Sequence, residues 1–103
     1  MNEKVLVTKS ELVDGMGIKW ILEYYILIFD VGLGQRSYGI GIEGRSFNKD
    51  ASEKSLSEST QGGITHSFDE AEEWVCKLAQ GTAFPINLHE YVNDFIYEKE
   101  NAG

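Results

Sequence analysis

The residue types that most often carry chemistry are few in this chain and scattered along it. There are two histidines, His66 and His89, and a single cysteine, Cys76. A transition-metal site needs several clustered nitrogen or sulfur ligands, and a nucleophilic cysteine needs a base and an electropositive setting. His66 precedes an expected helix start, His89 falls on a solvent-facing helical position, and Cys76 flanks a helical core face. The sequence therefore predicts no catalytic residue, no metal site and no cofactor.

A glycine pattern in residues 39–44 matches the G-x-G-x-x-G of dinucleotide-binding loops. That pattern binds a pyrophosphate when the glycines join the end of a strand to the start of a helix. Here Gly39 and Gly41 alternate with Ile40 and Ile42 inside an expected strand, and a polar segment follows. We interpret these glycines as small residues beneath a neighbouring side chain, and we expect no nucleotide site.

The charge of the chain is acidic and unevenly distributed. Nine Lys and Arg stand against seventeen Asp and Glu, a formal net charge of −8, and residues 67–103 hold eight acids and two bases. Nucleic acids and anionic membranes are bound through clusters of Lys and Arg, which this chain lacks. We expect neither partner. The acidic run over residues 69–73 falls in the first turns of a helix, where it complements the helix dipole and faces solvent.

Cysteine content and hydropathy indicate the compartment. One cysteine cannot form an intrachain disulfide. The N-terminal residues do not resemble a signal peptide, and the longest apolar run, residues 24–29, is far shorter than the roughly 20 residues of a spanning helix. We expect a cytoplasmic protein.

The first half of the chain has the alternation of β-strands. Between Ile18 and Phe29, every second residue is apolar on one face, and residues 36–43 alternate in the same way. Asp14-Gly15 is a favourable two-residue turn, and a hairpin folded there would place Val7 opposite Leu22 and Val5 opposite Tyr24.

The second half predicts a loop and two helices. Residues 48–63 are polar and are expected to form a flexible loop. Ser67 and Glu70 form a capping box that begins one helix, and a second begins at Asn87 with helical apolar spacing. Strands before helices favour a single α+β domain over residues 1–103: an antiparallel sheet of three or four strands followed by two C-terminal helices packed on one face.

One apolar patch has no obvious cover in this architecture. Tyr25, Leu27 and Phe29 lie on the second face of their strand, above the small residues Gly39 and Gly41. Exposed apolar patches often mark association surfaces, so we expect a non-enzymatic interaction module, either homodimeric or binding another protein. The alternative cover is the chain itself, through Phe47, Leu33 or the N-terminus.

Two other functions stay open. A small-ligand or enzymatic site could lie in a pocket between sheet and helices near Trp20, Trp74 and His89, provided that polar groups converge there. Alternatively, the acidic residues of 67–103 could bind a basic partner.

A short set of residues resembles a known family. Tyr38-Gly39-Ile40 in a strand, a helix ending near Leu78, Pro85-x-x-Leu88, and Val92 with Asn93-Asp94-Phe95 are similar to a family of small uncharacterised proteins of Gram-positive spore-forming bacteria. The resemblance covers about the last two thirds of the chain. It implies a bacterial cytoplasmic setting and no established activity.

Overall fold

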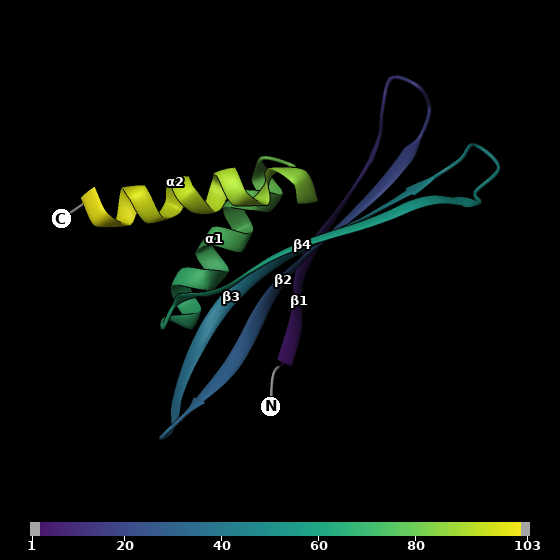
Figure 1. The fold of residues 1–103 in the computed structure, drawn as a ribbon. Helices are drawn as coiled ribbons and strands as arrows, with labels where there is room; N and C mark the ends of the chain where they lie inside the picture. The colour runs from purple at the N-terminus through teal and green to yellow at the C-terminus, as the bar shows by residue number, and fades with distance from the viewer. Residues whose placement is uncertain (1–2, 102–103) are drawn as a thin grey trace.

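Four strands form one antiparallel sheet, and two helices follow them in the chain (Figure 1). The computed structural model describes residues 3–101. The strands are β1 (Glu3–Val13), β2 (Lys19–Gly32), β3 (Gln35–Phe47) and β4 (Glu53–Thr65), paired in the order β1-β2-β3-β4. The helices are α1 (Phe68–Gln80) and α2 (Leu88–Asn101), and a 3-10 turn, η1 (Pro85–Asn87), precedes α2. The α+β class and the order of elements agree with the prediction.

The core lies between the sheet and the helices. The apolar face of β2 supplies its centre because side chains alternate across a strand, and the i, i+3, i+4 positions of the helices close over it. The buried apolar residues are Leu22, Tyr24, Ile26, Ile28, Ile40, Ile42, Ala71, Trp74, Val75, Leu78, Ala83, Leu88, Val92 and Phe95.

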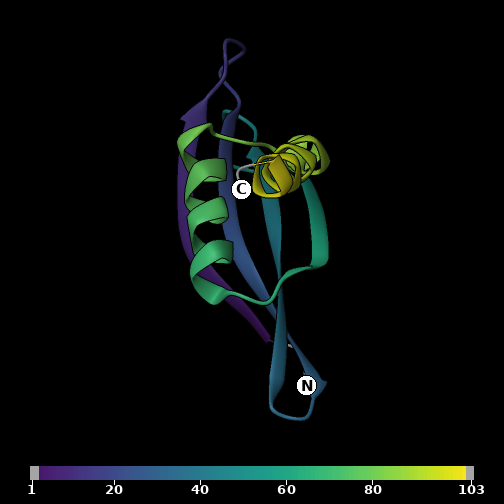
Figure 2. The same cartoon turned by 90° about the vertical axis from the view of Figure 1, so that its left-hand side faces the viewer.

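The two helices cover different parts of the same sheet face (Figure 2). The α1 helix packs over β1, β2 and β3, whereas η1 and the start of α2 lie over β3 and β4. The C-terminal half of α2 leaves the sheet (Figure 1). It is held to α1 by the stacked rings of Trp74 and Phe95, whose centroids are 5.5 Å apart, and by an ion pair of 2.7 Å between Lys99 and Glu70.

The β1–β2 hairpin has a longer turn than the sequence predicted. Val5 pairs with Ile26, not with Tyr24. The cause is the carboxylate of Asp14, which accepts hydrogen bonds from the amides of Met16 and Ile18 and so builds a wider turn.

A β-bulge in β1 then decides which side chains face the helices. The wider turn pairs Lys9 with Glu23 and Glu11 with Ile21, so both lie on the face away from the helices, opposite to the predicted register. The register shift between Leu6 and Thr8 then restores the predicted face for the residues before it. Val5 remains on the helix side, as expected, and Val7 packs against the core.

A correction concerns residues 48–63, which the sequence predicted as a flexible loop. Only residues 48–52 form the connection, closed by hydrogen bonds from the Asn48 amide to the Ser52 carbonyl and from the Ala51 amide to the Asn48 carbonyl. Residues 53–63 belong to β4, which pairs with β3 along its length. Composition did not reveal this strand because backbone hydrogen bonds to β3, rather than buried apolar side chains, hold it in the sheet.

Candidate functional site

The face of the sheet turned away from the helices is the first candidate site. Neither α1 nor α2 covers it (Figure 1). Cross-strand partners in an antiparallel sheet share a face, so the register assigns the side chains. We call this surface the open face; its apolar members are Leu6, Val13, Ile21, Tyr25, Leu27, Phe29, Phe47 and Leu56.

The predicted patch lies on the open face, but its two glycines are not accessible. Tyr25 pairs with Gly41 and Leu27 with Gly39, as the strand pattern suggested. Both glycines are buried, whereas Tyr25, Leu27 and Phe29 are half-buried. The glycines are covered by β4, a segment whose sequence predicts a loop. The accessible part of the patch is therefore its three large side chains.

A bulge in β4 shapes the end of this patch. The β3–β4 register shifts between the pairs Ile40–Gln61 and Tyr38–Thr65, and the extra residues of β4 pass over Gly39. The ring of Phe29 lies against Gly62 in this bulge. The chain thus supplies its own cover over Gly39 and leaves the area around Tyr25 and Leu27 open.

An ionic cluster borders Tyr25 on the open face. Glu43 is 8% exposed and accepts hydrogen bonds from Arg45 at 2.9 Å and from Lys4 at 3.3 Å. The Lys4 ammonium also lies 4.1 Å from the centre of the Tyr25 ring and 3.8 Å from Glu58. The cluster spans β1, β3 and β4, so only strand pairing brings it together, and no sequence motif indicates it.

The cluster keeps its groups charged. The Arg45 hydrogen bonds hold the pKa of Glu43 below its ordinary value against the opposing effect of burial, and Lys4 contributes in the same direction. Burial disfavours the charged form of Lys4, but the hydrogen bond and charge of Glu43 outweigh it and raise the Lys4 pKa. A satisfied ionic cluster of this kind sets the register of a surface rather than providing a reactive group.

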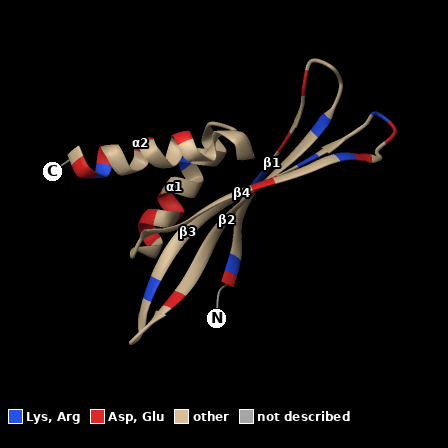
Figure 3. Ribbon diagram, in the orientation of Figure 1, with Lys and Arg blue, Asp and Glu red and all other residues tan. Residues whose placement is uncertain are grey.

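Charges on the open face nearly balance. Five acids and four bases point from it: Glu11, Glu23, Glu43, Glu53, Glu58, Lys4, Lys9, Lys19 and Arg45. The excess acid of the chain lies mainly in residues 67–103, which include both helices (Figure 3). The open face is therefore the nearly neutral side of a strongly acidic protein.

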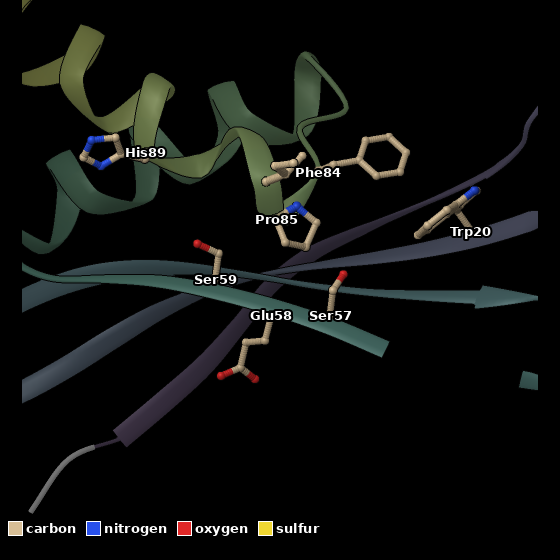
Figure 4. Close-up of a pocket in the computed structure, with 8 residues that line it drawn as sticks. Trp20, Ser57, Glu58, Ser59, Phe84, Pro85 and His89 are labelled. Atoms are coloured by element: carbon tan, nitrogen blue, oxygen red, sulfur yellow. The ribbon is translucent and has the colours of Figure 1, made fainter. Parts of the chain in front are cut away.

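A groove beside β4 is the second candidate site (Figure 4). It has a volume of about 520 Å³ and runs between β4 and the segment that leads into α2. One wall is formed by Phe84, Pro85 and Ile86, and the other by Ser57 and Ser59. The remaining lining residues are Trp20, Glu58 and His89.

The groove unites two of the three residues predicted to line a pocket between sheet and helices. Trp20 packs edge-on against Phe84, with ring centroids 5.1 Å apart. His89 lies at the other end, next to the side-chain amides of Gln61 at 3.4 Å and Asn93 at 3.3 Å. Trp74 lies elsewhere, stacked on Phe95 between the two helices.

The chemistry available in this groove is recognition rather than an evident reaction. Its ionisable groups are Glu58 and His89, and Figure 4 shows the Glu58 side chain directed away from the groove. The polar neighbours of His89 are amides, which supply neither a nucleophile nor a carboxylate partner. His66 is apart from both sites, with its Nδ1 atom 3.1 Å from the Arg36 carbonyl oxygen.

Metal binding and membrane insertion require features that the described residues would have to supply. Over residues 3–101, no group of three or more His, Cys, Asp and Glu side chains is arranged to hold a metal ion. In the same part of the chain, no helix combines the length and apolarity needed to cross a membrane.

Comparison with known proteins places the chain in a family but assigns no activity. A family described as a family of unknown function, DUF6514, matches residues 3–98. The match extends over all four strands and most of α2. No curated protein and no solved structure matches the chain.

Proposed function

The chain belongs to the DUF6514 family of unknown function, and we propose that it is a non-enzymatic interaction module that self-associates through the open face. One observation carries the proposal: both helices pack on one side of the sheet, and apolar side chains remain on the other. Apolar sheet faces are normally buried against a second layer. We also propose that the protein is bacterial and cytoplasmic, as expected from the sequence.

The charge distribution favours a second copy as this layer. Two chains of net charge −8 repel each other most where their acidic helices would meet. The open face carries five acids and four bases, so two such faces approach with little net repulsion. In a twofold arrangement the same patch serves both subunits, and an acid of one copy can meet a base of the other.

The size of the open face is also suitable. Four strands spaced about 4.8 Å apart and about eight residues long cover roughly 500 Å² in projection. The accessible area of such a surface is larger, because side chains such as Leu6 and Leu56 stand out from it at 47% and 57% exposure. A standard interface buries about 800 Å² per partner, so the open face is of the right order.

Sedimentation velocity over a range of protein concentrations tests the proposal. We expect the wild-type chain to be dimeric at tens of micromolar. Leu6→Asp and Leu56→Asp place an unpaired charge in the interface and should weaken association by at least about tenfold. Both side chains are exposed in the single chain, so the variants should fold normally.

Tyr97→Asp is the matched control. Tyr97 is 67% exposed on α2, away from the open face, so the same charge there should leave the dimer intact. A wild-type chain that stays monomeric at several hundred micromolar would refute self-association. A dimer that is insensitive to both open-face variants would show that a different surface is used.

A further inference from the structure

The exposed edge of β4 and the groove beside it form one continuous surface. β4 pairs with β3 on one side only, and no other described strand pairs with its second edge. From Ser55 to Gln61 the register with β3 is regular, so this stretch presents a straight edge with unpaired backbone groups. Such an edge can accept a further strand.

The side chains of this stretch leave room for an added strand. Ser57 and Ser59 point into the groove, and Glu58 points to the opposite face (Figure 4). The two hydroxymethyl groups are small, whereas the facing wall is apolar and includes Ile86, which is 88% exposed. A neighbouring strand would direct its groove-side residues between the serines and this apolar wall.

We propose that the β4 edge binds an extended segment of a partner protein in which apolar residues alternate with basic ones. The apolar side chains would enter the groove next to Phe84, Pro85 and Ile86. The basic side chain between them would lie on the other face, opposite Glu58. Main-chain hydrogen bonds along Ser55–Gln61 would supply the remaining affinity.

The negative charge of Glu58 is the reason to expect a basic residue in the partner segment. Glu58 supplies the one carboxylate of the groove lining, and its side chain is 54% exposed. Its ion pair with Lys4 is long, at 3.8 Å, because Lys4 bonds more closely to Glu43. A Lys or Arg on the added strand would lie about 5 Å from Glu58 across the strands, within reach of an ion pair.

A second copy of β4 does not meet these requirements. Its residues facing the groove would be serines, whose hydroxyl groups would lie unpaired against an apolar wall. Pairing centred on Glu58 would also oppose two like charges. The occupant is therefore a segment of a different sequence.

The test uses a labelled heptapeptide of alternating valine and lysine, with fluorescence anisotropy for affinity and amide chemical shifts for location. We expect the valine–lysine peptide to bind with a dissociation constant below about 1 mM and to change the amide chemical shifts of Ser55–Gln61 and Ile86. Binding should be about tenfold weaker when lysine is replaced by glutamate or valine by serine. Two further peptides carry N-methyl groups, one on the odd-numbered amides and one on the even-numbered amides. Only one of the two should lose binding, because every second amide of an added strand faces the edge strand.

Two protein variants sharpen the test. Ile86→Asp should weaken binding by about tenfold without affecting folding, because Ile86 is exposed. Glu58→Lys should reverse the preference, so that the valine–glutamate peptide binds better than the valine–lysine peptide.

Three results would overturn this inference. These are no binding at 1 mM, shifts confined to the open face, or binding that is unaffected by Ile86→Asp and by Glu58→Lys. Glu58 belongs to the open face as well as to the β4 edge, so a dimer formed through that face competes for it. The monomeric Leu6→Asp variant should therefore bind the peptide at least as tightly as wild type, whereas Ile86→Asp should weaken peptide binding and leave the oligomeric state unchanged.

Discussion

The backbone of Gly62 passes directly over Gly39, so closely that a β-carbon on residue 39 would lie 2.7 Å from the Gly62 Cα atom. The carbonyl oxygen of Gln61 would be in contact with the same β-carbon. Both obstacles are main-chain atoms, which cannot move aside by changing a rotamer. The bulge of β4 therefore depends on the absence of a side chain at residue 39.

Gly39→Ala should destabilise the protein by at least about 2 kcal/mol, because β4 must shift away from β3 to admit the methyl group. Urea unfolding measures this change. Gly15→Ala is the control: a β-carbon there meets nothing within 4 Å, so its effect should be within about 0.5 kcal/mol. Equal stability of the two variants would contradict the close packing of β4 on Gly39.

Tyr24→Phe should destabilise the protein by about 1–2 kcal/mol. The Tyr24 hydroxyl is fully buried and donates a hydrogen bond of 3.0 Å to the Ala83 carbonyl, so its removal leaves that carbonyl without this donor. Tyr97→Phe removes the same hydroxyl from an exposed tyrosine and should be neutral. Thermal unfolding of the two variants side by side distinguishes the buried bond from a general effect of the substitution.

Glu70 should make a pH-dependent contribution to stability. Its carboxylate accepts hydrogen bonds from Lys99 and Thr65, which lower its pKa below the ordinary 4.5. A carboxyl with a lowered folded pKa stabilises the fold above about pH 4.5 and loses that contribution as the pH falls through the folded value.

The free energy of unfolding of the wild type should therefore exceed that of Glu70→Gln by about 0.5–1 kcal/mol at pH 7. This value is reduced because both partners of the ion pair are partly exposed. The difference between the two proteins should vanish at low pH. Urea unfolding between pH 7 and pH 3 measures the two curves. Glu72→Gln, an exposed change on the same helix, should show no such convergence. A pH-independent difference for Glu70→Gln would mean that packing, not charge, explains its effect.

Asp14 should control the β1–β2 turn. Its carboxylate accepts hydrogen bonds from the Ile18 and Met16 amides and from the Trp20 indole, and these bonds lower its pKa below the ordinary 3.8. The wild-type turn should keep these hydrogen bonds above about pH 3.8 and lose them as the pH falls through the pKa of Asp14 in the folded protein. The Trp20 indole N–H resonance should report the change, with a midpoint below 3.8.

Asp14→Ala should remove the acceptor oxygens of all three hydrogen bonds and increase amide exchange at Met16 and Ile18 at every pH. Asp14→Asn keeps one oxygen acceptor and should show an intermediate effect without the acid transition. Unchanged exchange in Asp14→Ala would show that the backbone alone specifies the turn.

The parts of the fold that were predicted correctly are those with local signals. Alternation located β2 and β3, and the capping of Ser67, which accepts a hydrogen bond from the Glu70 amide, located the start of α1. The other half of the expected capping box is absent among the described contacts: the Glu70 side chain turns to Thr65 and Lys99 instead. The Lys99 ammonium outcompetes the backbone amide at the helix start because it carries a full positive charge, and the Thr65 hydroxyl adds a second hydrogen bond.

The parts that were predicted wrongly depend on partners distant in sequence. The β1–β2 register required the three hydrogen bonds of Asp14 and the bulge near Val7, neither of which leaves a periodic pattern. The polar residues 53–63 gave no sign of β4 because their strand is defined by pairing with β3. The three large side chains of the predicted patch lie where expected, and the two glycines are covered by β4.

By itself, the sequence determined that this is an acidic α+β chain with two closing helices and an apolar second face on β2, because hydrophobic periodicity and charge are local properties. The tertiary structure alone decided that β4 completes the sheet, that Lys4, Glu43 and Arg45 meet on the open face, and that a groove runs beside a free strand edge. These features arise from backbone pairing between strands, which is nearly independent of side-chain type and therefore leaves little trace in the order of the residues.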